Sequence, residues 1–221
     1  MRIALFGGTF DPPHRGHIAI ARAAANTFAL DRVLFAPTGL QPLKLSTEPT
    51  PFATRLALVS AACQPGYPES DPRFAPSSID APHPDSTPNY TVDTLAALAA
   101  QYPHDTLFNL VGADSFLSLR QWHQSDRLFD LAEWIVVTRP GYSLSESALT
   151  PLALTPAQRA RVHILTGVAE DISATTLRER LHHGDPCTDL LPNAVASYIQ
   201  AENLYDVGHR TGKPTSTSTS V

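Results

Sequence analysis

Short apolar runs alternate with longer amphipathic stretches along this chain. "RIALF" (Arg2–Phe6), "RVLFAP" (Arg32–Pro37) and "TLFNLVG" (Thr106–Gly112) have the length of buried strands, and each run is stopped by glycine or proline. Between the first two, "HIAIARAAANTFAL" (His17–Leu30) spaces its apolar residues along one helix face. Strand, helix and strand within about 36 residues predict a βαβ unit, and such units build parallel sheets.

The alternation continues to the last predicted helix and fixes the expected fold class. Further strands are predicted at Glu133–Pro140 and Arg161–Gly167, and further helices at Pro51–Cys63, Tyr90–Tyr102, Ala174–Gly184 and Pro192–Tyr205. This order predicts an α/β protein with a doubly wound, Rossmann-like parallel sheet, helices on both faces and a C-terminal helical segment.

Two stretches interrupt this alternation of predicted strands and helices. Residues 65–88 contain seven prolines and predict a long irregular loop around one edge strand, "RFAPSSI" (Arg73–Ile79). Residues 208–221 are polar and low in complexity, so a disordered tail is expected there. We expect residues 1–207 to form a single domain, in which 168–205 make the C-terminal helical part.

Composition narrows the class of protein. The 221 residues are 43% hydrophobic, enough for one core, and the net charge of −5 gives no global basic field for nucleic acid. The two cysteines, Cys63 and Cys187, lack metal-ligand spacing and favour a reducing compartment. With no apolar run long enough for a signal peptide or membrane helix, we expect a soluble cytoplasmic protein with no membrane partner. Self-association stays open.

The segment "GGTFDPPHRGH" (Gly7–His17) follows the first predicted strand, where ligands bind in open parallel sheets. Gly7 and Gly8 let the backbone approach a ligand closely, and the amides of Thr9 and Phe10 can face a phosphate. A helix beginning near Gly16 or His17 adds its positive dipole end. His14 and His17 lie about one helical turn apart and can face the same anion. These parts suit phosphate binding, although a turn with two exposed histidines uses the same residues.

The whole segment resembles the G-x-F-D-P-x-H-x-G-H signature of the nucleotidylyltransferase superfamily. Members of this superfamily transfer a nucleoside monophosphate from a nucleoside triphosphate to a phosphate-bearing acceptor. The resemblance implies that His14 and His17 bind the triphosphate and stabilise charge at the α-phosphate, with Gly7, Gly8, Thr9, Phe10 and Gly16 shaping the nucleotide site. Zinc is a poor alternative, because H-x-x-H alone lacks a third ligand.

A second informative segment is "ISATTLRERL" (Ile172–Leu181), about 155 residues further on. Hydroxyls and amides at a predicted helix start, together with Arg178, can hold phosphate oxygens. An ordinary helix cap beside a surface arginine is the alternative. The segment resembles the superfamily's I-S-S-T-x-[IL]-R motif, with Ala174 in place of the second serine. The resemblance implies nucleotide contacts from Ile172, Ser173, Thr175 and Thr176, and a catalytic role for Arg178.

Three stretches between these motifs indicate the acceptor. "NYTVDTL" (Asn89–Leu95), "LVGADSFLSLRQWH" (Leu110–His123) and "VVTRPGY" (Val136–Tyr142) resemble motifs of the bacterial nicotinate-nucleotide adenylyltransferases, and "QPLK" (Gln41–Lys44) takes the place of their P-P-H-K. From the residues alone, Asp114 reads equally well as a ribose acceptor or a helix cap, and Trp122 reads first as a half-buried core residue.

The resemblance implies a role for each matching residue. Trp122 stacks on the nicotinate ring, while Thr91 and the backbone near His123 receive its carboxylate. Gly112 and Asp114 belong to the nucleotide site with Arg139, Asp114 holding the ribose, and Lys44 meets acceptor or triphosphate oxygens as a fourth catalytic residue. The implied substrates are ATP and nicotinate mononucleotide, and Mg²⁺ travels with the ATP phosphates without a dedicated protein site.

Other readings remain at this point. Within the superfamily the acceptor can be nicotinamide mononucleotide or phosphopantetheine. The chain can also be a nucleotide-binding sensor that keeps the fold without the chemistry. A fragment related to class I aminoacyl-tRNA synthetases, which share H-x-G-H, is disfavoured by the acidic net charge.

Overall fold

The computed structural model describes residues 1–40, 49–138, 144–168 and 172–205 and contains one six-stranded sheet. The strands are β1 (Arg2–Gly8), β2 (Arg32–Pro37), β3 (Phe74–Pro76), β4 (Thr106–Gly112), β5 (Glu133–Val137) and β6 (Val162–Leu165). All pairings are parallel, in the order β3-β2-β1-β4-β5-β6. This is the doubly wound order, and it confirms the predicted fold class.

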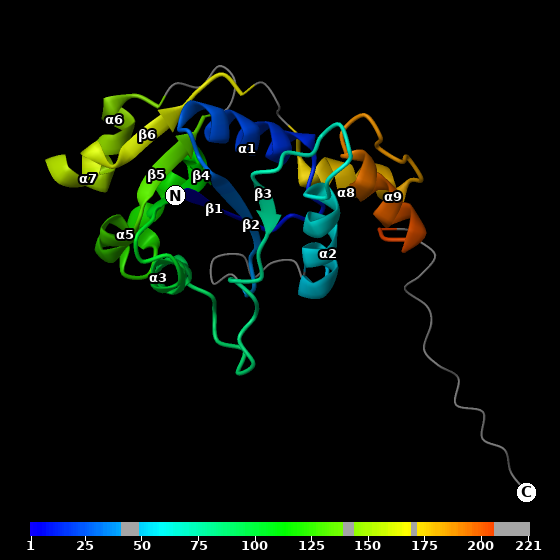
Figure 1. Cartoon of the computed structure of the whole chain (residues 1–221), viewed down its shortest axis with the longest axis horizontal. Coiled ribbons are helices and arrows are strands. Elements are labelled where there is room, and N and C mark those ends of the chain that lie inside the picture. Colours follow the sequence, from blue (N-terminus) through cyan, green and yellow to red (C-terminus); the bar gives the residue numbers. More distant parts are fainter. Residues whose placement is uncertain (41–48, 139–143, 169–171, 206–221) are drawn as a thin grey trace, which may run out of the picture.

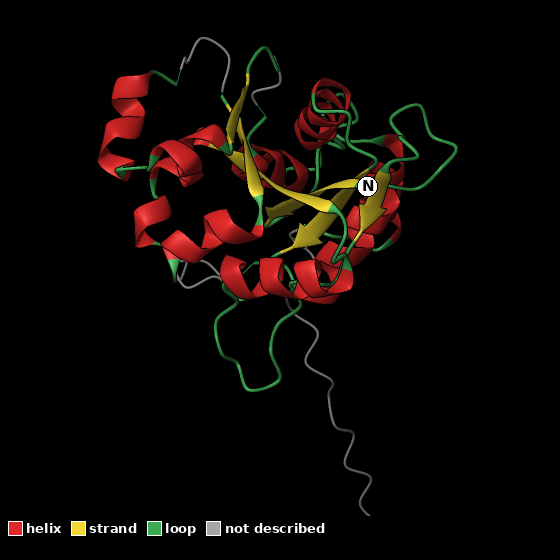
Figure 2. Cartoon of the chain, turned by 60° about the vertical axis from the view of Figure 1, so that its left-hand side comes forward, coloured by secondary structure: helices red, strands yellow, loops and turns green. Residues whose placement is uncertain are grey.

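The helices cover both faces of the sheet (Figures 1 and 2). Residues of β1 alternate between two cores: Ala4 and Phe6 face one, Ile3 and Leu5 the other. The first core is covered by α1 (Arg15–Thr27), α2 (Phe52–Ala62), α8 (Ala174–His182) and α9 (Asn193–Ala201). The second is covered by α3 (Thr91–Gln101), α4 (Ala113–Leu117), η1 (Leu119–Gln121), α5 (Ser125–Leu131), α6 (Glu146–Leu149) and η2 (Thr150–Leu152).

Several boundaries differ from the sequence-based expectation. Helix α1 starts at Arg15, earlier than Gly16 or His17, because His14 adopts the extended backbone of an N-cap. The predicted edge strand Arg73–Ile79 shortens to the three residues of β3, since only Val33–Phe35 of β2 pair with it. The short α4 to α6 and α7 (Pro156–Ala160) were not predicted.

No helix in the described part of the chain is both long and apolar enough to cross a membrane. The tail expected at 208–221 lies outside the described residues, as do Lys44 and Arg139.

Candidate active site

A cavity of about 630 Å³ opens at the carboxyl ends of the central strands. The chain leaves β1 towards β2 on one side, while β4 lies on the other, so the cavity sits where the strand order reverses. Ligands of doubly wound sheets bind at this switch point. The cavity is lined by seven of the residues proposed from the sequence: Gly7, Gly8, Thr9, Thr91, Asp114, Trp122 and His123.

The end of β1 leaves room for a ligand. A methyl group added to Gly7 would meet no atom within 4 Å, so the backbone there faces open cavity. At Gly8 the added carbon would lie 3.1 Å from the Phe10 ring. Phe10 itself has a positive φ of 49°, which turns the chain sharply after the strand. The glycine pair therefore serves two purposes, an open wall at Gly7 and space for an aromatic ring at Gly8.

The two predicted histidines meet at the start of α1. Their rings stack with centroids 3.7 Å apart. The Nδ1 atom of His17 accepts a hydrogen bond from the backbone N–H of His14 at 3.2 Å. With Nδ1 used as an acceptor, a neutral His17 carries its proton on Nε2. His17 is thereby prepared to donate a hydrogen bond to an anion.

Burial keeps both histidines uncharged. The pKa of His14 falls from 6.5 to about 4 because the residue is only 6% exposed and its ring is desolvated. The pKa of His17 lies well below 6.5, first because of desolvation and second because of the charge on His14 when that is protonated. The buried Nδ1 of His14 has no hydrogen-bond partner within the described residues. Near pH 7 the pair therefore offers hydrogen-bonding groups rather than fixed positive charge.

An aromatic cluster, which the sequence did not reveal, supports His17. The buried Phe10 ring lies edge-on to His17, with centroids 4.9 Å apart, and also contacts Phe6 at 5.4 Å and Phe35 at 5.7 Å. Phe10 was predicted for its amide, which no observation tests. Its side chain has a clear structural function, because it fixes the ring of His17 against the end of β1.

The second motif folds against the first. Ser173 is the N-cap of α8, and its Oγ accepts the N–H of Thr176 at 3.4 Å. Arg178, one turn into the helix, donates from Nη1 to the backbone carbonyl of Asp11 at 2.7 Å and from Nη2 to the Thr175 hydroxyl at 3.4 Å. Two motifs about 155 residues apart in sequence are thus joined directly. Ile172, just before the cap, packs on the first core.

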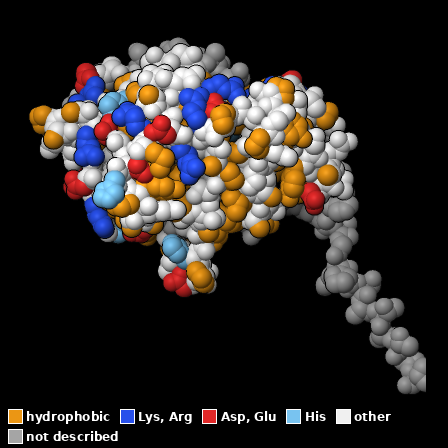
Figure 3. Space-filling model, in the orientation of Figure 1, with side chains coloured by type: hydrophobic (Ala, Val, Ile, Leu, Met, Phe, Trp, Pro, Cys, Tyr) orange, Lys and Arg blue, Asp and Glu red, His pale blue; other side chains and the backbone are white. Residues whose placement is uncertain are grey.

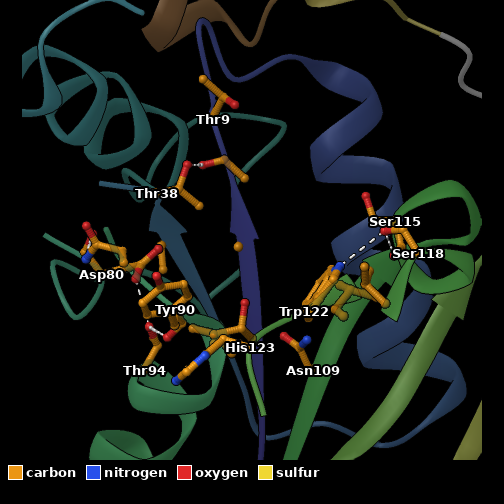
Figure 4. Close-up of a pocket in the computed structure, with 18 of the residues that line it drawn as sticks. Thr9, Thr38, Asp80, Tyr90, Thr94, Asn109, Ser115, Ser118, Trp122 and His123 are labelled. Carbon is orange, nitrogen blue, oxygen red and sulfur yellow. Dashed lines mark hydrogen bonds between the residues drawn. The ribbon is translucent and has the colours of Figure 1, made fainter. Parts of the chain in front are cut away.

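The opposite wall of the cavity is aromatic (Figure 4). Trp122 is half-buried and donates from Nε1 to Ser118 Oγ at 3.1 Å, while its ring lies edge-on to the buried Trp134. His123 lies beside Tyr90 with ring centroids 4.4 Å apart. Thr91 is the first residue of α3. The N-cap of this helix is Tyr90, whose side chain makes no capping hydrogen bond to the first turn. The N-terminal turn of α3 therefore lies at a wall of the cavity.

The loop after β4 resolves one alternative. Gly112 is the N-cap of α4 and Asp114 is inside the helix, so the interpretation of Asp114 as the cap is wrong. Asp114 lines the cavity, whereas Gly112 does not belong to the lining residues.

Two buried polar residues, Arg55 and Asp80, and the half-buried Asn89 were given no role in the sequence analysis. Arg55, on α2, is 2% exposed and donates to three backbone carbonyls. Asp80 accepts from the Thr94 hydroxyl at 2.7 Å, and burial raises its pKa. Asn89 accepts from Leu40 N–H at 2.9 Å and donates to Ala81 O at 2.9 Å. A cation inside an otherwise apolar predicted helix was the one available signal, at Arg55.

A metal site built by the protein itself is absent from the described residues, which contain no group of three or more His, Cys, Asp or Glu side chains able to hold an ion.

Comparison with known proteins agrees with this geometry. A family described as cytidylyltransferase-like matches residues 5–180. A probable nicotinate-nucleotide adenylyltransferase of Corynebacterium kroppenstedtii is 39% identical over 92% of this chain and 90% of its own length. One from Thermus thermophilus is 37% identical over 93% of this chain and 100% of its own.

Solved structures support the fold. A Plasmodium falciparum nicotinic acid mononucleotide adenylyltransferase complexed with APC has a TM-score of 0.71 and covers 92% of this chain and 96% of its own. A structure of that protein complexed with NaAD has a TM-score of 0.70. Their sequences are 17% and 16% identical to this one, so the likeness concerns the fold alone.

Proposed function

This chain belongs to the nicotinate-nucleotide adenylyltransferase family, and we propose that its cavity transfers the adenylyl group of ATP to nicotinate mononucleotide in NAD biosynthesis, giving deamido-NAD and pyrophosphate. The observation that carries the proposal is the joining of the two phosphate motifs beside an aromatic cavity at the strand switch point. A donor that presents a triphosphate and an acceptor that presents a flat ring fit these two parts.

The triphosphate is assigned to the part of the site where the segments Gly7–His17 and Ile172–Leu181 meet. His14, His17 and Arg178 are the catalytic groups there, and Lys44 joins them from outside the described residues. The remaining nucleotide contacts are assigned to the backbone and side chains named from the motifs, including Arg139, which also lies outside the described residues. These contacts are Gly7, Gly8, Thr9, Phe10, Gly16, Gly112, Asp114, Arg139, Ile172, Ser173, Thr175 and Thr176.

The acceptor is assigned to the aromatic wall. The Trp122 ring offers a stacking surface for the nicotinate ring, held in place by the bond from Nε1 to Ser118. The first amides of α3, at Thr91, and the backbone at His123 receive the carboxylate. The described residues that line the cavity include no lysine or arginine, so among them the backbone amides are the groups assigned to the carboxylate.

The reaction needs positioning more than it needs a base. The acceptor phosphate is anionic near neutral pH and attacks the α-phosphorus in line, while the bond to the β-phosphate oxygen breaks and pyrophosphate leaves. The His17 Nε2–H and the Arg178 guanidinium donate to oxygens whose charge grows during this step. A neutral His17 can do this because its Nδ1 already accepts from the His14 N–H, which leaves the proton on Nε2.

Mg²⁺ is proposed as the companion of ATP. The described residues hold no cluster of three potential ligands, which fits an ion bound mainly by phosphate oxygens and water. When bound, it neutralises charge on the triphosphate. The protein's contribution is then to hold the phosphates that carry it.

Small molecules are the proposed partners, and the cytoplasm is the proposed location. On the face shown in Figure 3, basic and acidic side chains are interspersed, and the net charge is −5. Ion pairs such as Arg159–Glu146 and Arg120–Asp126 join opposite charges at the surface. This distribution gives little reason to propose a nucleic acid as partner.

The test offers three acceptors in parallel. Pyrophosphate release is measured with Mg-ATP and nicotinate mononucleotide, nicotinamide mononucleotide or phosphopantetheine. The proposal predicts a clear preference for nicotinate mononucleotide that Trp122→Ala weakens. Equal or better use of another acceptor would refute the assignment of the aromatic wall, and release with none would refute the reaction.

A further inference from the structure

Arg55 places a guanidinium in the interior behind the active site. It lies in the first turn of α2 and is 2% exposed. Each of its three nitrogens donates to a different backbone carbonyl: Nε to Thr50 at 2.7 Å, Nη1 to Thr9 at 2.9 Å and Nη2 to Thr38 at 2.9 Å. A buried cation is costly unless it is satisfied in this way, so its presence calls for a function.

The three carbonyls belong to three separate segments around the site. Thr9 follows β1 and Thr38 follows β2, and both line the cavity (Figure 4). Thr50 precedes α2. The ends of β1 and β2 are further joined by the Thr38 N–H, which donates to Gly8 O at 2.9 Å. Arg55 thus fixes the spacing between the loop of the first motif and its neighbours.

The hydrogen bonds continue from Thr50 to the second motif. The Thr50 N–H donates to Asp11 Oδ2 at 3.0 Å, and Asp11 is 5% exposed. The backbone carbonyl of the same Asp11 accepts from Arg178. Arg55 and Arg178 are therefore connected through two residues, although they come from α2 and α8.

The end of the described chain completes this network. After α9 the chain turns back, and the Tyr205 hydroxyl donates to Asp11 Oδ1 at 2.7 Å. Figure 1 shows α2, α8 and α9 as neighbours, and this packing brings Tyr205 to the first motif. Both oxygens of the Asp11 carboxylate are thus occupied by groups that lie far away in sequence.

We propose that Arg55 is a positioning residue for the triphosphate: through Thr9, Thr50 and Asp11 it holds the first motif against Arg178, and Tyr205 binds the other oxygen of the same carboxylate. This inference rests on the proposed function for the identity of the ligand. Arg55 touches neither substrate; it sets the geometry of the groups that do. Lysine cannot replace it, because one ammonium cannot reach three carbonyls that are arranged around a planar fork.

Charge supports the same arrangement. Burial lowers the pKa of Arg55, and the negative charge of Asp11 opposes that change. The carboxylate thus favours the charged guanidinium, and Thr50 hydrogen-bonds to both groups, which makes the network sensitive to loss of any one member.

The experiment compares Arg55→Lys and Tyr205→Phe with two matched controls. Arg73→Lys alters another hydrogen-bonded arginine, one paired with Asp71, and Tyr198→Phe alters another tyrosine packed on the first core. For each folded protein, Mg-ATP affinity is measured by calorimetry without acceptor, and KM for each substrate and kcat are measured with nicotinate mononucleotide.

Arg55→Lys is expected to weaken Mg-ATP binding about tenfold or more, the size of one lost hydrogen bond to a charged group. Tyr205→Phe should weaken it about threefold or more, with KM for the acceptor changed less than twofold in both variants and the controls unchanged. If Arg55 has only a structural role, Arg55→Lys lowers the fraction of active protein and leaves the Mg-ATP affinity and both KM values as in wild type. That outcome overturns the proposal.

The design separates this inference from the proposed function. Wild-type protein that binds Mg-ATP but makes no dinucleotide would contradict the proposed function alone, because the calorimetric comparison still decides the role of Arg55. If Arg55→Lys fails to fold, Tyr205→Phe decides: unchanged Mg-ATP affinity in that variant overturns the proposal.

Discussion

Replacing His14 by glutamine should remove much of the fold's sensitivity to acid. The folded chain lowers the pKa of His14 from 6.5 to about 4 by burial. Between these values the unfolded chain binds more protons than the folded chain. His14 therefore does not reduce the unfolding free energy above pH 6.5, and it reduces this free energy increasingly as the pH is lowered towards 4. From the two pKa values, His14 alone removes about 2.5 kcal/mol of unfolding free energy between pH 8 and pH 4.5.

The assay is urea unfolding of wild type and His14→Gln at pH 8 and pH 4.5. Carboxyl groups titrate in both proteins, so their contribution cancels in the comparison. The wild type should lose about 2.5 kcal/mol more than the variant. The pKa of His17 is lowered too, but His17 is present in both proteins, so the loss caused by its own desolvation cancels in the comparison. His104→Gln is the control, because the ring of His104 is exposed and changes its surroundings little on unfolding.

Equal acid losses in wild type and His14→Gln, within about 0.5 kcal/mol, would contradict a lowered pKa of His14 in the folded chain. They would mean that His14 is not desolvated in the folded chain. The interpretation of the pair as neutral hydrogen-bonding groups at pH 7 would then fail with it.

Three further predictions concern the site and its walls. His17→Ala should lower kcat by about 10²–10³-fold, the usual effect of losing one donor to a developing charge, and a loss under tenfold in steady-state assays would contradict its role. Trp122→Ala should raise KM for nicotinate mononucleotide about tenfold, because stacking contributes about 1–3 kcal/mol, while KM for ATP stays near wild type; equal rises would contradict the assignment. Gly39→Ala should lower the unfolding free energy by about 2–4 kcal/mol in urea titrations, because its new carbon would lie 2.2 Å from Asn89 Oδ1 and displace a side chain with three hydrogen bonds. Gly7→Ala, which meets no atom within 4 Å, is the control for stability, and similar losses in the two would contradict the steric argument.

The sheet followed from the sequence because its strands are buried on both faces. Runs such as Arg32–Pro37 and Thr106–Gly112 are mostly apolar and match β2 and β4 residue for residue. Helices of nine to thirteen residues, such as α1 and α8, were also predicted, since they are long enough to show a repeating apolar face. The four or five residues of α4 or α6 are about one turn, which is too short for a period to appear.

The site was predictable where its residues follow strand ends and unpredictable where distant segments meet. Gly7, Thr9 and Trp122 were proposed from local motifs, and all three line the cavity. Arg55 binds carbonyls, which every residue possesses, so the sequence contains no trace of its partners. Tyr205 reaches Asp11 across 194 positions, a contact that depends on how α9 packs.

The most direct test of the account is to identify the product made by purified wild-type protein. The protein is incubated with ATP labelled at the α-phosphate, Mg²⁺ and nicotinate mononucleotide. The nucleotides are then separated and identified by mass spectrometry. If the site transfers an adenylyl group, the label appears in deamido-NAD, in equal amount to the pyrophosphate released. Label that remains in ATP, or that appears only in AMP or ADP, would contradict adenylyl transfer as the function of this site.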